Sequence, residues 1–271
     1  MKKIKNIAIE LFDITDIKPS RSGGEHEISL DSVIDRSNFT DVLAVDFDNL
    51  AQYIDHTLLK ADATKNDIIK IVKEANKYQF KSICINSSFI PFAKTILNKN
   101  ILICTVVGFP LGASNSKTKL IETETALKDG ANEIDMVINI GMIKSCEYGY
   151  VYQEIKSLAS TCHNKGAILK VILETSLLTE KEKIIVSLLS KKAGADFVKT
   201  STGFSTGGAT KEDISLMRKV VGNKVGVKAS GGVRDRGGVI KMLKAGANRI
   251  GASAGVSIVE NFETMVENNS Y

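Results

Sequence analysis

The sequence contains little proline, cysteine or histidine. Its 271 residues include three prolines, four cysteines and three histidines, and no low-complexity tract is present. This composition argues against a fibrous or disordered chain and predicts a folded globular protein. The cysteines show no Cys-x-x-Cys spacing and no pairing with the histidines, so we expect reduced thiols and no zinc or other metal site.

An excess of one charge and long apolar runs are also lacking. The formal net charge is +5, and the basic residues are scattered among Asp and Glu along amphipathic segments. This scatter argues against nucleic-acid binding and suits a phosphorylated metabolite. No apolar run approaches membrane-spanning length. The basic start MKKIKNIAIELFDITD resembles a signal peptide, but acidic residues interrupt its apolar part, so we expect a cytoplasmic protein.

From about residue 51 onward, short β-branched runs alternate with helical patterns. The eight runs are 52–57, 81–86, 101–108, 132–139, 167–174, 196–200, 224–229 and 248–252. Thr64 with Asp67 and Thr210 with Asp213 have capping-box spacing, and 68–75 carries an apolar helix face. Strands too apolar to face water, each followed by a helix, predict parallel βαβ units. The fold class is therefore α/β, and a single (β/α)8 TIM barrel is the simplest closure.

A repeated unit locates the functional end of this barrel. LKDGANEID, KKAGADFVK and LKAGANRIG each contain a helix end, a glycine that suits a helix C-cap, and a strand. Counting five residues from each glycine reaches Asp135, Lys199 and Gly251, which we expect at matching heights near the C-terminal ends of their strands. Barrels of this class build their active sites at that end.

We divide the chain into three parts. Residues 50–260 form the barrel, and residues 261–271 form a C-terminal tail. Residues 1–49 form an N-terminal extension that we expect to be partly helical and packed on the barrel bottom, because DFDNLAQYI resembles a helix leading into the first strand.

Lys199 and Lys228 end two consecutive strands, in DFVK and VGVK. Neighbouring strands lie about 4.8 Å apart, so two inward-facing ammonium groups there come within several ångströms. Two charges about 4 Å apart at an effective dielectric near 20 repel each other by roughly 4 kcal/mol. This energy corresponds to about three pKa units, enough to leave one lysine largely neutral near pH 7. A neutral amine in a water-poor pocket forms a Schiff base with a carbonyl. The alternative is that both lysines reach solvent at the barrel rim.

Asp135 supplies a third charge. In NEIDMVIN it lies on the strand face opposite Ile134 and Met136, and a carboxylate there points into the barrel lumen. It then pairs with an ammonium group and relays protons through a water, or it forms a plain salt bridge. Asp55 and Thr57 are candidate polar contacts of the lumen or rim. Cys84 and His56 lie on early strands and are further candidates for the lumen, with ordinary core packing as the alternative.

Glycine-rich loops follow the last three strands. They are TSTGFSTGG, ASGGVRDRGG and IGASAGVS, and each offers backbone N–H groups with little steric cover. Any one of them fits ordinary turn chemistry. Three on consecutive strand ends beside two lysines predict a phosphorylated substrate, because such loops bind phosphate in barrels of this kind.

Five segments together carry a resemblance to a known family. IDHTLLKADAT, EIDMVIN, LKVILET, ADFVKTSTGFSTGGAT and VGVKASGGVR resemble the 2-deoxyribose-5-phosphate aldolases, class I aldolases with a (β/α)8 barrel, over about residues 50–260. The resemblance implies reversible cleavage of 2-deoxy-D-ribose 5-phosphate to acetaldehyde and D-glyceraldehyde 3-phosphate, in deoxyribonucleotide catabolism. It implies that the reaction needs no metal or organic cofactor, and that the protein forms a homodimer or a higher homo-oligomer.

The resemblance also implies residue roles. Lys199 is the Schiff-base lysine, Lys228 the lysine that lowers its pKa, and Asp135 the acid/base partner acting through water. Thr202, Gly203, Gly231, Gly232 and Ser253 help bind the phosphate. Asp55, Thr57 and Cys84 are further candidate substrate contacts, chosen for their positions on the first two strands. Tyr271 ends the chain, and a C-terminal tyrosine visits the active site in part of the family.

The chain departs from the pattern at Phe204, where some relatives carry a phosphate-binding lysine, and Arg234 or backbone amides are then expected to replace that charge. Two alternatives stay open. One is another cofactorless barrel isomerase or synthase that acts on a sugar phosphate. The other is a non-catalytic sugar-phosphate-binding protein.

Overall fold

The computed structural model describes residues 45–260, and within them eight parallel strands close into a barrel in chain order. The strands are β1 (Ile54–Leu58), β2 (Ser82–Ile85), β3 (Leu102–Val107), β4 (Glu133–Val137), β5 (Ile168–Ile172), β6 (Phe197–Lys199), β7 (Gly226–Ser230) and β8 (Arg249–Ala252). The boundaries of each strand lie within two residues of the predicted ones. The predicted (β/α)8 barrel is confirmed.

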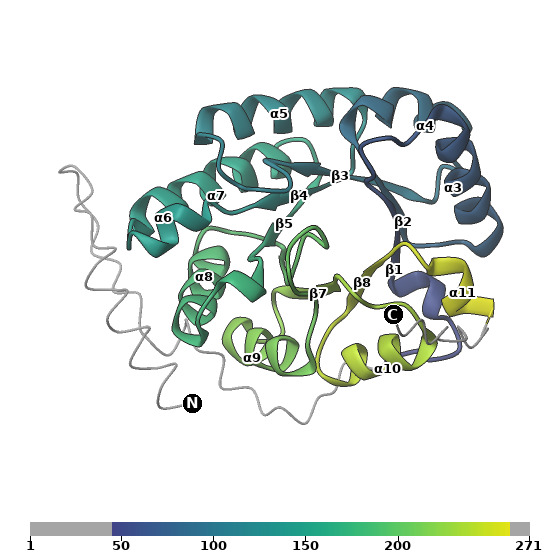
Figure 1. Cartoon of the computed structure of the whole chain (residues 1–271). Coiled ribbons are helices and arrows are strands. Elements are labelled where there is room, and N and C mark those ends of the chain that lie inside the picture. The colour runs from purple at the N-terminus through teal and green to yellow at the C-terminus, as the bar shows by residue number, and fades with distance from the viewer. Residues whose placement is uncertain (1–44, 261–271) are drawn as a thin grey trace, which may run out of the picture.

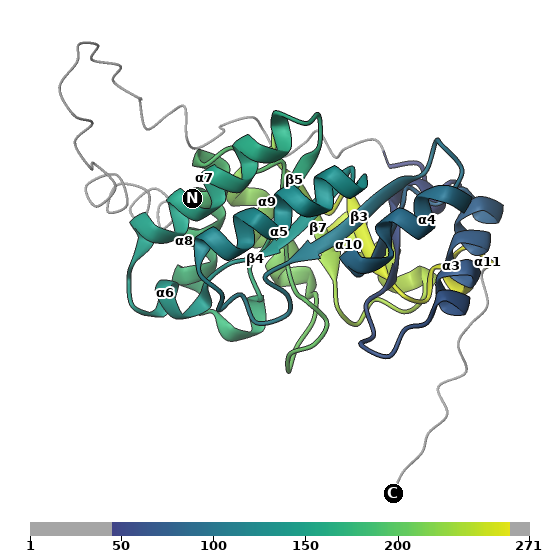
Figure 2. The ribbon, with the colours of Figure 1, turned by 90° about the horizontal axis from the view of Figure 1, so that it is seen from above.

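Helices cover the outside of the barrel (Figure 1). The helices between strands are α3 (Lys65–Tyr78), α4 (Ile90–Ile96), α5 (Ser116–Asp129), α7 (Tyr148–His163), α8 (Glu180–Lys192), α9 (Lys211–Val221) and α10 (Arg236–Lys244), and α11 (Gly255–Glu260) follows β8. Short additional turns are α6 (Ile140–Lys144), η1 (Leu50–Tyr53), η2 (Ser87–Phe89) and η3 (Thr175–Leu177). Figure 2 shows α5 and α7 side by side along the outer surface.

The predicted capping signals are met in full at one helix and in part at another. At α3 the Thr64 and Asp67 side chains each accept a hydrogen bond from the other's backbone N–H, which is a complete capping box. At α9 the Thr210 hydroxyl accepts from the Asp213 amide, but the Asp213 carboxylate binds Lys183 at 2.6 Å. The Asp213 carboxylate, which the sequence pattern assigns to the helix cap, instead forms an ion pair with Lys183 of α8.

The glycines of the repeated unit adopt the conformation that the sequence predicts. Gly130, Gly194 and Gly246 have φ values of +117°, +88° and +113°, and they end α5, α8 and α10 respectively. Side chains rarely adopt this left-handed region, so glycine stops each helix with little strain. The chain then turns directly into the next strand.

The prediction that Asp135, Lys199 and Gly251 lie at matching heights along their strands is wrong. Lys199 pairs with Ile172 on one side and Lys228 on the other, and Lys228 pairs with Arg249. Asp135 pairs with Lys170, which lies two residues before Ile172, the partner of Lys199. Gly251 pairs with Ser230, which lies two residues after Lys228, the other partner of Lys199. A barrel closes only with a stagger between strands, and that stagger produces the offset. A shift of two residues keeps a side chain on the same face, so the lumen-facing prediction survives.

Apolar side chains pack on both sides of the strands. The larger cluster fills the space between the barrel and the helices, with Ile134, Met136 and Val171 among its fully buried members. A small second cluster lies inside the barrel and comprises Leu59, Cys84, Cys104 and Val106, with Phe109 packed against it. The lumen is therefore apolar next to β2 and β3.

Two predicted segments fall largely outside the described residues. Residues 1–44 and 261–271 are not described, so the N-terminal extension, the C-terminal tail and the role of Tyr271 stay predictions. Near the barrel, the predicted helix is a single 3-10 turn, η1, whose Ala51 carbonyl accepts from the Lys81 amide just before β2. Among residues 45–260, no helix has the length and hydropathy needed to cross a membrane.

Candidate active site

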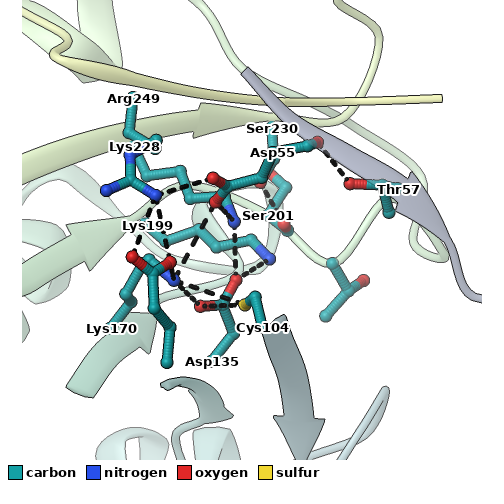
Figure 3. A network of polar contacts seen from close by, with 12 residues as sticks. Asp55, Thr57, Cys104, Asp135, Lys170, Lys199, Ser201, Lys228, Ser230 and Arg249 are labelled. Atoms are coloured by element: carbon teal, nitrogen blue, oxygen red, sulfur yellow. Dashed lines mark hydrogen bonds and ion pairs between the residues drawn. The ribbon is translucent and has the colours of Figure 1, made fainter. Parts of the chain in front are cut away.

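Seven charged side chains meet inside the barrel (Figure 3). They are Asp55 from β1, Glu133 and Asp135 from β4, Lys170 from β5, Lys199 from β6, Lys228 from β7 and Arg249 from β8, and each is at most 6% exposed. Strand side chains alternate between two faces, and these residues occupy the inward positions of their strands. Charged groups so deeply buried need partners of opposite sign, and here they supply one another's.

Asp135 is the centre of this cluster. Its Oδ1 accepts from Lys170 Nζ at 2.7 Å, and its Oδ2 accepts from Lys199 Nζ at 2.7 Å and Lys228 Nζ at 2.8 Å. Burial by itself would raise the pKa of Asp135, but the three ammonium groups hold that pKa well below its ordinary value. The predicted convergence of Lys199, Lys228 and Asp135 is therefore present in the structure.

A second layer of charge lies deeper in the barrel. Arg249 Nη1 is 2.7 Å from Asp55 Oδ1 and 3.0 Å from Glu133 Oε2. Asp55 also binds Lys228 at 2.5 Å, and Glu133 binds Lys170 at 2.6 Å. Burial opposes ionisation of Asp55, yet the cations of Lys228, Arg249 and Lys170 lower its pKa.

The four cations differ in how many carboxylates they touch. Lys170, Lys228 and Arg249 each bind at least two, and for Lys170 and Lys228 these raise the pKa well above its usual range although burial works against it. Lys199 binds Asp135 alone among the described carboxylates, and it shares that group with two other lysines. Lys199 also ends β6, and at 3% exposure it is the least buried of the three lysines in the cluster.

Sequence reasoning missed Lys170, Glu133 and Arg249 as members of the cluster. Each interrupts an apolar run, in AILKVILE, NEIDMVIN and NRIGA, at a position that alternation places inside the barrel. That is the signal that identified Asp135. Lys199 and Lys228 were identified because each ends a strand and precedes a glycine-rich loop. Lys170, Glu133 and Arg249 are not followed directly by such a loop, so this criterion does not identify them.

The two lumen thiols lie beside the charge network. Cys84 and Cys104 are register partners on β2 and β3, and both are fully buried. Cys104 Sγ donates to Asp135 Oδ1 at 3.2 Å, and burial raises the pKa of that thiol well above its usual value. Cys84, Cys104 and Asp135 place ligand atoms within 4.8 Å of one another, but three ammonium groups already surround the carboxylate. This donor set favours ion pairs over a metal ion.

His56 does not face the lumen with Asp55. It is on the other side of β1, where Nε2 contacts Glu74 Oε2 of α3 at 2.7 Å and the ring lies 4.7 Å from that of Phe80. The expectation that His56 lines the barrel interior is wrong, because alternation turns neighbouring residues of a strand to opposite faces. Thr57 returns to the inner face, and its hydroxyl donates to the Asp55 carbonyl at 2.8 Å.

The glycine loops meet above Lys199 and Lys228. Gly203, Gly231 and Gly232 have φ values of +85°, +85° and +78°, and the Ala209 amide donates to the Gly231 carbonyl at 2.9 Å. A Cβ on Gly208 would lie 2.3 Å from that carbonyl oxygen, so the loops after β6 and β7 touch backbone to backbone. Ser253 is exposed just after β8.

Thr202 already has a partner for both of its donors. Its amide and its hydroxyl both donate to Glu174 Oε2, and Glu174 is 2% exposed in a left-handed conformation after β5. The Phe204 amide in turn donates to the Thr202 hydroxyl oxygen at 3.0 Å. Glu174 therefore fixes the start of the loop that follows β6. The spacing of these residues in the sequence does not indicate this contact.

Phe204 and Phe109 also meet at the barrel mouth. Their rings lie edge to face with centroids 5.2 Å apart, although Phe109 follows β3 and Phe204 follows β6. Phe204 is 55% exposed. An aromatic contact thus occupies the position at which the family resemblance raised the expectation of a cation. Arg234 is exposed in the loop after β7.

Comparison with known proteins agrees with this geometry. The model of the DeoC/LacD family aldolases matches residues 49–262. The chain belongs to this family. It is 55% identical over 214 residues to a deoxyribose-phosphate aldolase of Bacillus cereus (strain AH187), covering 79% of this chain and 96% of the relative. It is 56% identical over 217 residues to the enzyme of that name from Caldanaerobacter subterraneus subsp. tengcongensis, covering 79% and 94%.

A solved family member shares the fold. The tetrameric deoxyribose phosphate aldolase from Aeropyrum pernix superposes with a TM-score of 0.74 at 34% identity, covering 82% of this chain and 94% of that one. The family match spans the whole barrel, including every member of the charge network.

Proposed function

We propose that the protein cleaves 2-deoxy-D-ribose 5-phosphate reversibly to acetaldehyde and D-glyceraldehyde 3-phosphate through a Schiff base on Lys199. The observation that carries the proposal is the pairing of Lys199 with Asp135 alone, while the other three cations of the lumen cluster each bind two or more carboxylates. Family membership and the names of the relatives support the same reaction.

The reaction begins with addition of the Lys199 amine to the C1 aldehyde of the open-chain sugar. Loss of water from the carbinolamine gives an iminium ion, which serves as the electron sink. Removal of the C3 hydroxyl proton then breaks the C2–C3 bond. The bond's electron pair forms an enamine on Lys199, and glyceraldehyde 3-phosphate leaves.

Asp135 and Lys228 support the proton transfers of this sequence. The Asp135 carboxylate lies 2.7 Å from the Lys199 ammonium and stays ionised because of its cationic neighbours. We assign it to take the C3 hydroxyl proton through a water and to return a proton to C2 of the enamine. Hydrolysis of the resulting iminium ion releases acetaldehyde and restores the amine. Lys228, held protonated by Asp55 and Asp135, stabilises the negative charge near the reacting atoms.

The substrate's phosphate is placed at the glycine loops. Backbone amides of Gly203, Gly231 and Gly232, with Ser253 and the guanidinium of Arg234, are the proposed donors. Thr202 contributes through the loop conformation that Glu174 holds. Asp55 and Thr57 on one side and Cys84 on the other border the sugar chain, and the apolar cluster around Cys84 suits the methyl group of acetaldehyde.

Reductive trapping tests the proposal. The protein is incubated with acetaldehyde and sodium borohydride, and the labelled peptides are mapped by mass spectrometry. We expect one ethyl group on Lys199, formed also when 2-deoxyribose 5-phosphate replaces acetaldehyde and absent from a Lys199→Arg variant. Absence of an adduct on Lys199, or equal labelling of exposed lysines such as Lys224, would refute the Schiff-base reaction and leave an isomerase, a synthase or a binding protein.

We further infer a homo-oligomer in the cytoplasm. The Aeropyrum pernix relative is tetrameric, and all four cysteines within the described residues are free thiols, as suits a reducing compartment. Light scattering coupled to size-exclusion chromatography measures the mass in solution. A mass equal to that of one chain would contradict the oligomer.

A further inference from the structure

Arg249 and Glu133 form the floor of the charge network. Arg249 Nη1 lies 3.1 Å and 3.0 Å from the two Glu133 oxygens, and its guanidinium lies 5.4 Å from the centroid of the Phe197 ring. Both residues are nearly fully buried. Within residues 45–260, neither contacts Lys199, so a direct part in the aldol chemistry does not account for them.

A chain of ion pairs of alternating sign connects this floor to Lys199 (Figure 3). Arg249 holds Asp55 and Glu133. Asp55 holds Lys228, and Glu133 holds Lys170. Both lysines converge on Asp135, which is the carboxylate that binds Lys199. Each link is 3.0 Å or shorter, so a change of charge on the floor acts on the reactive amine through buried groups that salt screens poorly.

The net charge of the ion-pair network depends on whether Lys199 carries its proton. The ionisable groups that face Lys199 from the surrounding strands are Asp55, Cys84, Cys104, Glu133, Asp135, Lys170, Lys228 and Arg249, with Glu174 after β5. With neutral thiols, four cations face three carboxylates in the ion-pair network, which gives a net charge of +1. The network becomes neutral when Lys199 loses its proton. Glu174 lies outside this network, bound to Thr202.

We propose that Arg249 and Glu133 are positioning residues whose opposite charges set the pH at which Lys199 becomes a nucleophile. Arg249 disfavours a proton on Lys199, and Glu133 favours one. This inference rests on the proposed function, because it concerns the amine that forms the Schiff base. It assigns a catalytic consequence to two residues that touch neither the substrate nor Lys199.

The test uses two variants with opposite expected signs. Arg249→Met removes a positive charge, so Lys199 keeps its proton to higher pH, and the midpoint of the acid limb of the kcat/KM profile rises. Glu133→Gln removes a negative charge, so the midpoint falls. A unit charge at this depth, at an effective dielectric near 20, corresponds to a shift of about one pH unit in each case. The double variant removes one charge of each sign and returns the midpoint close to that of the wild type.

Arg249→Lys is the matched control. It keeps the positive charge while losing the planar guanidinium, so the midpoint stays in place even where kcat falls. A purely structural role of Arg249 predicts the reverse, with Arg249→Lys and Arg249→Met impaired alike and no movement of the midpoint. Circular dichroism establishes that each variant is folded, and Glu133→Gln decides the question alone if Arg249→Met does not fold.

A second measurement separates failure of this inference from failure of the proposed function. The rate of reductive ethylation of Lys199 by acetaldehyde and cyanoborohydride is followed against pH by peptide mapping. Lack of ethylation in the wild type refutes the Schiff-base reaction itself. Ethylation with the same pH dependence in wild type, Arg249→Met and Glu133→Gln refutes only the role of the floor. Opposite shifts in the two variants confirm it.

Discussion

Lys199 lies directly opposite Lys228 on the neighbouring strand, and both ammonium groups bind the same oxygen of Asp135. Two cations in one register position repel each other, and a single carboxylate oxygen cannot balance both. Lys228 has a second carboxylate in Asp55, whereas Lys199 has none among the described residues. This inequality distinguishes two lysines that look equivalent in the sequence.

Lys228→Met tests the inequality. Three cations then face three carboxylates, so the network is neutral while Lys199 is still protonated, and the amine retains its proton to higher pH. We expect kcat to fall about 100- to 1,000-fold and the acid limb of the pH profile to move upward. Lys224→Met, which alters an exposed lysine just before β7, is the control and leaves both quantities unchanged. An unmoved acid limb in Lys228→Met would contradict the charge argument.

Gly208→Ala tests the contact between the two glycine loops. The added methyl group meets the Gly231 carbonyl at 2.3 Å, so the loops after β6 and β7 must separate. We expect KM for the phosphorylated sugar to rise about 10- to 100-fold, because misplacing a binding group by about 1 Å has effects of this size. Ethylation of Lys199 by acetaldehyde continues, since acetaldehyde carries no phosphate. Gly141→Ala, where the new Cβ has only an ordinary contact at 3.5 Å, leaves KM unchanged.

The buried pair of Lys119 and Glu154 supports β4 from outside the barrel. Lys119 Nζ lies 3.0 Å from Glu154 Oε2 and 2.8 Å from the Val137 carbonyl, and both side chains are fully buried. Lys119→Met leaves the Glu154 carboxylate without its counter-ion, and we expect the free energy of unfolding to fall by about 3–5 kcal/mol. Urea denaturation measures the loss. Lys119→Met combined with Glu154→Leu regains most of it, and a double variant as unstable as the single one would show that the ion pair is not the cause.

His56 predicts a loss of stability on acidification. Burial lowers the pKa of this imidazole, although Glu74 acts in the opposite direction. The unfolded chain therefore binds a proton more readily than the folded one, and the free energy of unfolding decreases as pH falls below about 6.5. His56→Gln flattens the pH dependence between about pH 5 and 7, measured by urea denaturation at each pH.

The strands were predictable because a barrel buries both faces of each one. That burial requires continuous apolar runs in the sequence, and the predicted boundaries of all eight strands lie within two residues of the observed ones. Asp135 was predictable for the same reason, since a carboxylate within such a run has only the lumen to occupy. The same logic extends to Lys170, whose charge also interrupts an apolar run.

Register and partner choice were not predictable in this way. The register that aligns Lys199 with Lys228 and Arg249, and not with Gly251, is set by pairing between neighbouring strands, so no pattern within a single strand contains it. The Thr202 pairing with Glu174 likewise joins residues 28 positions apart through side-chain geometry. The individual phosphate donors beside Thr202 were assigned from the resemblance, and the KM of loop variants for the phosphorylated sugar tests them.

The ion pair between Asp55 and Arg249 has a consequence for how the chain folds. These residues are 194 positions apart and lie on β1 and β8, the two strands that seal the barrel. Until the seam forms, the network is open to water and its charges are hydrated; as it forms, they lose that water and gain one another. Contacts of such long sequence separation form slowly, since loop closure must come first. We therefore expect the Asp55 links to Lys228 and Arg249 to form late, when β8 closes against β1, whereas the contacts of Asp135 with the three lysines need only β4 to β7.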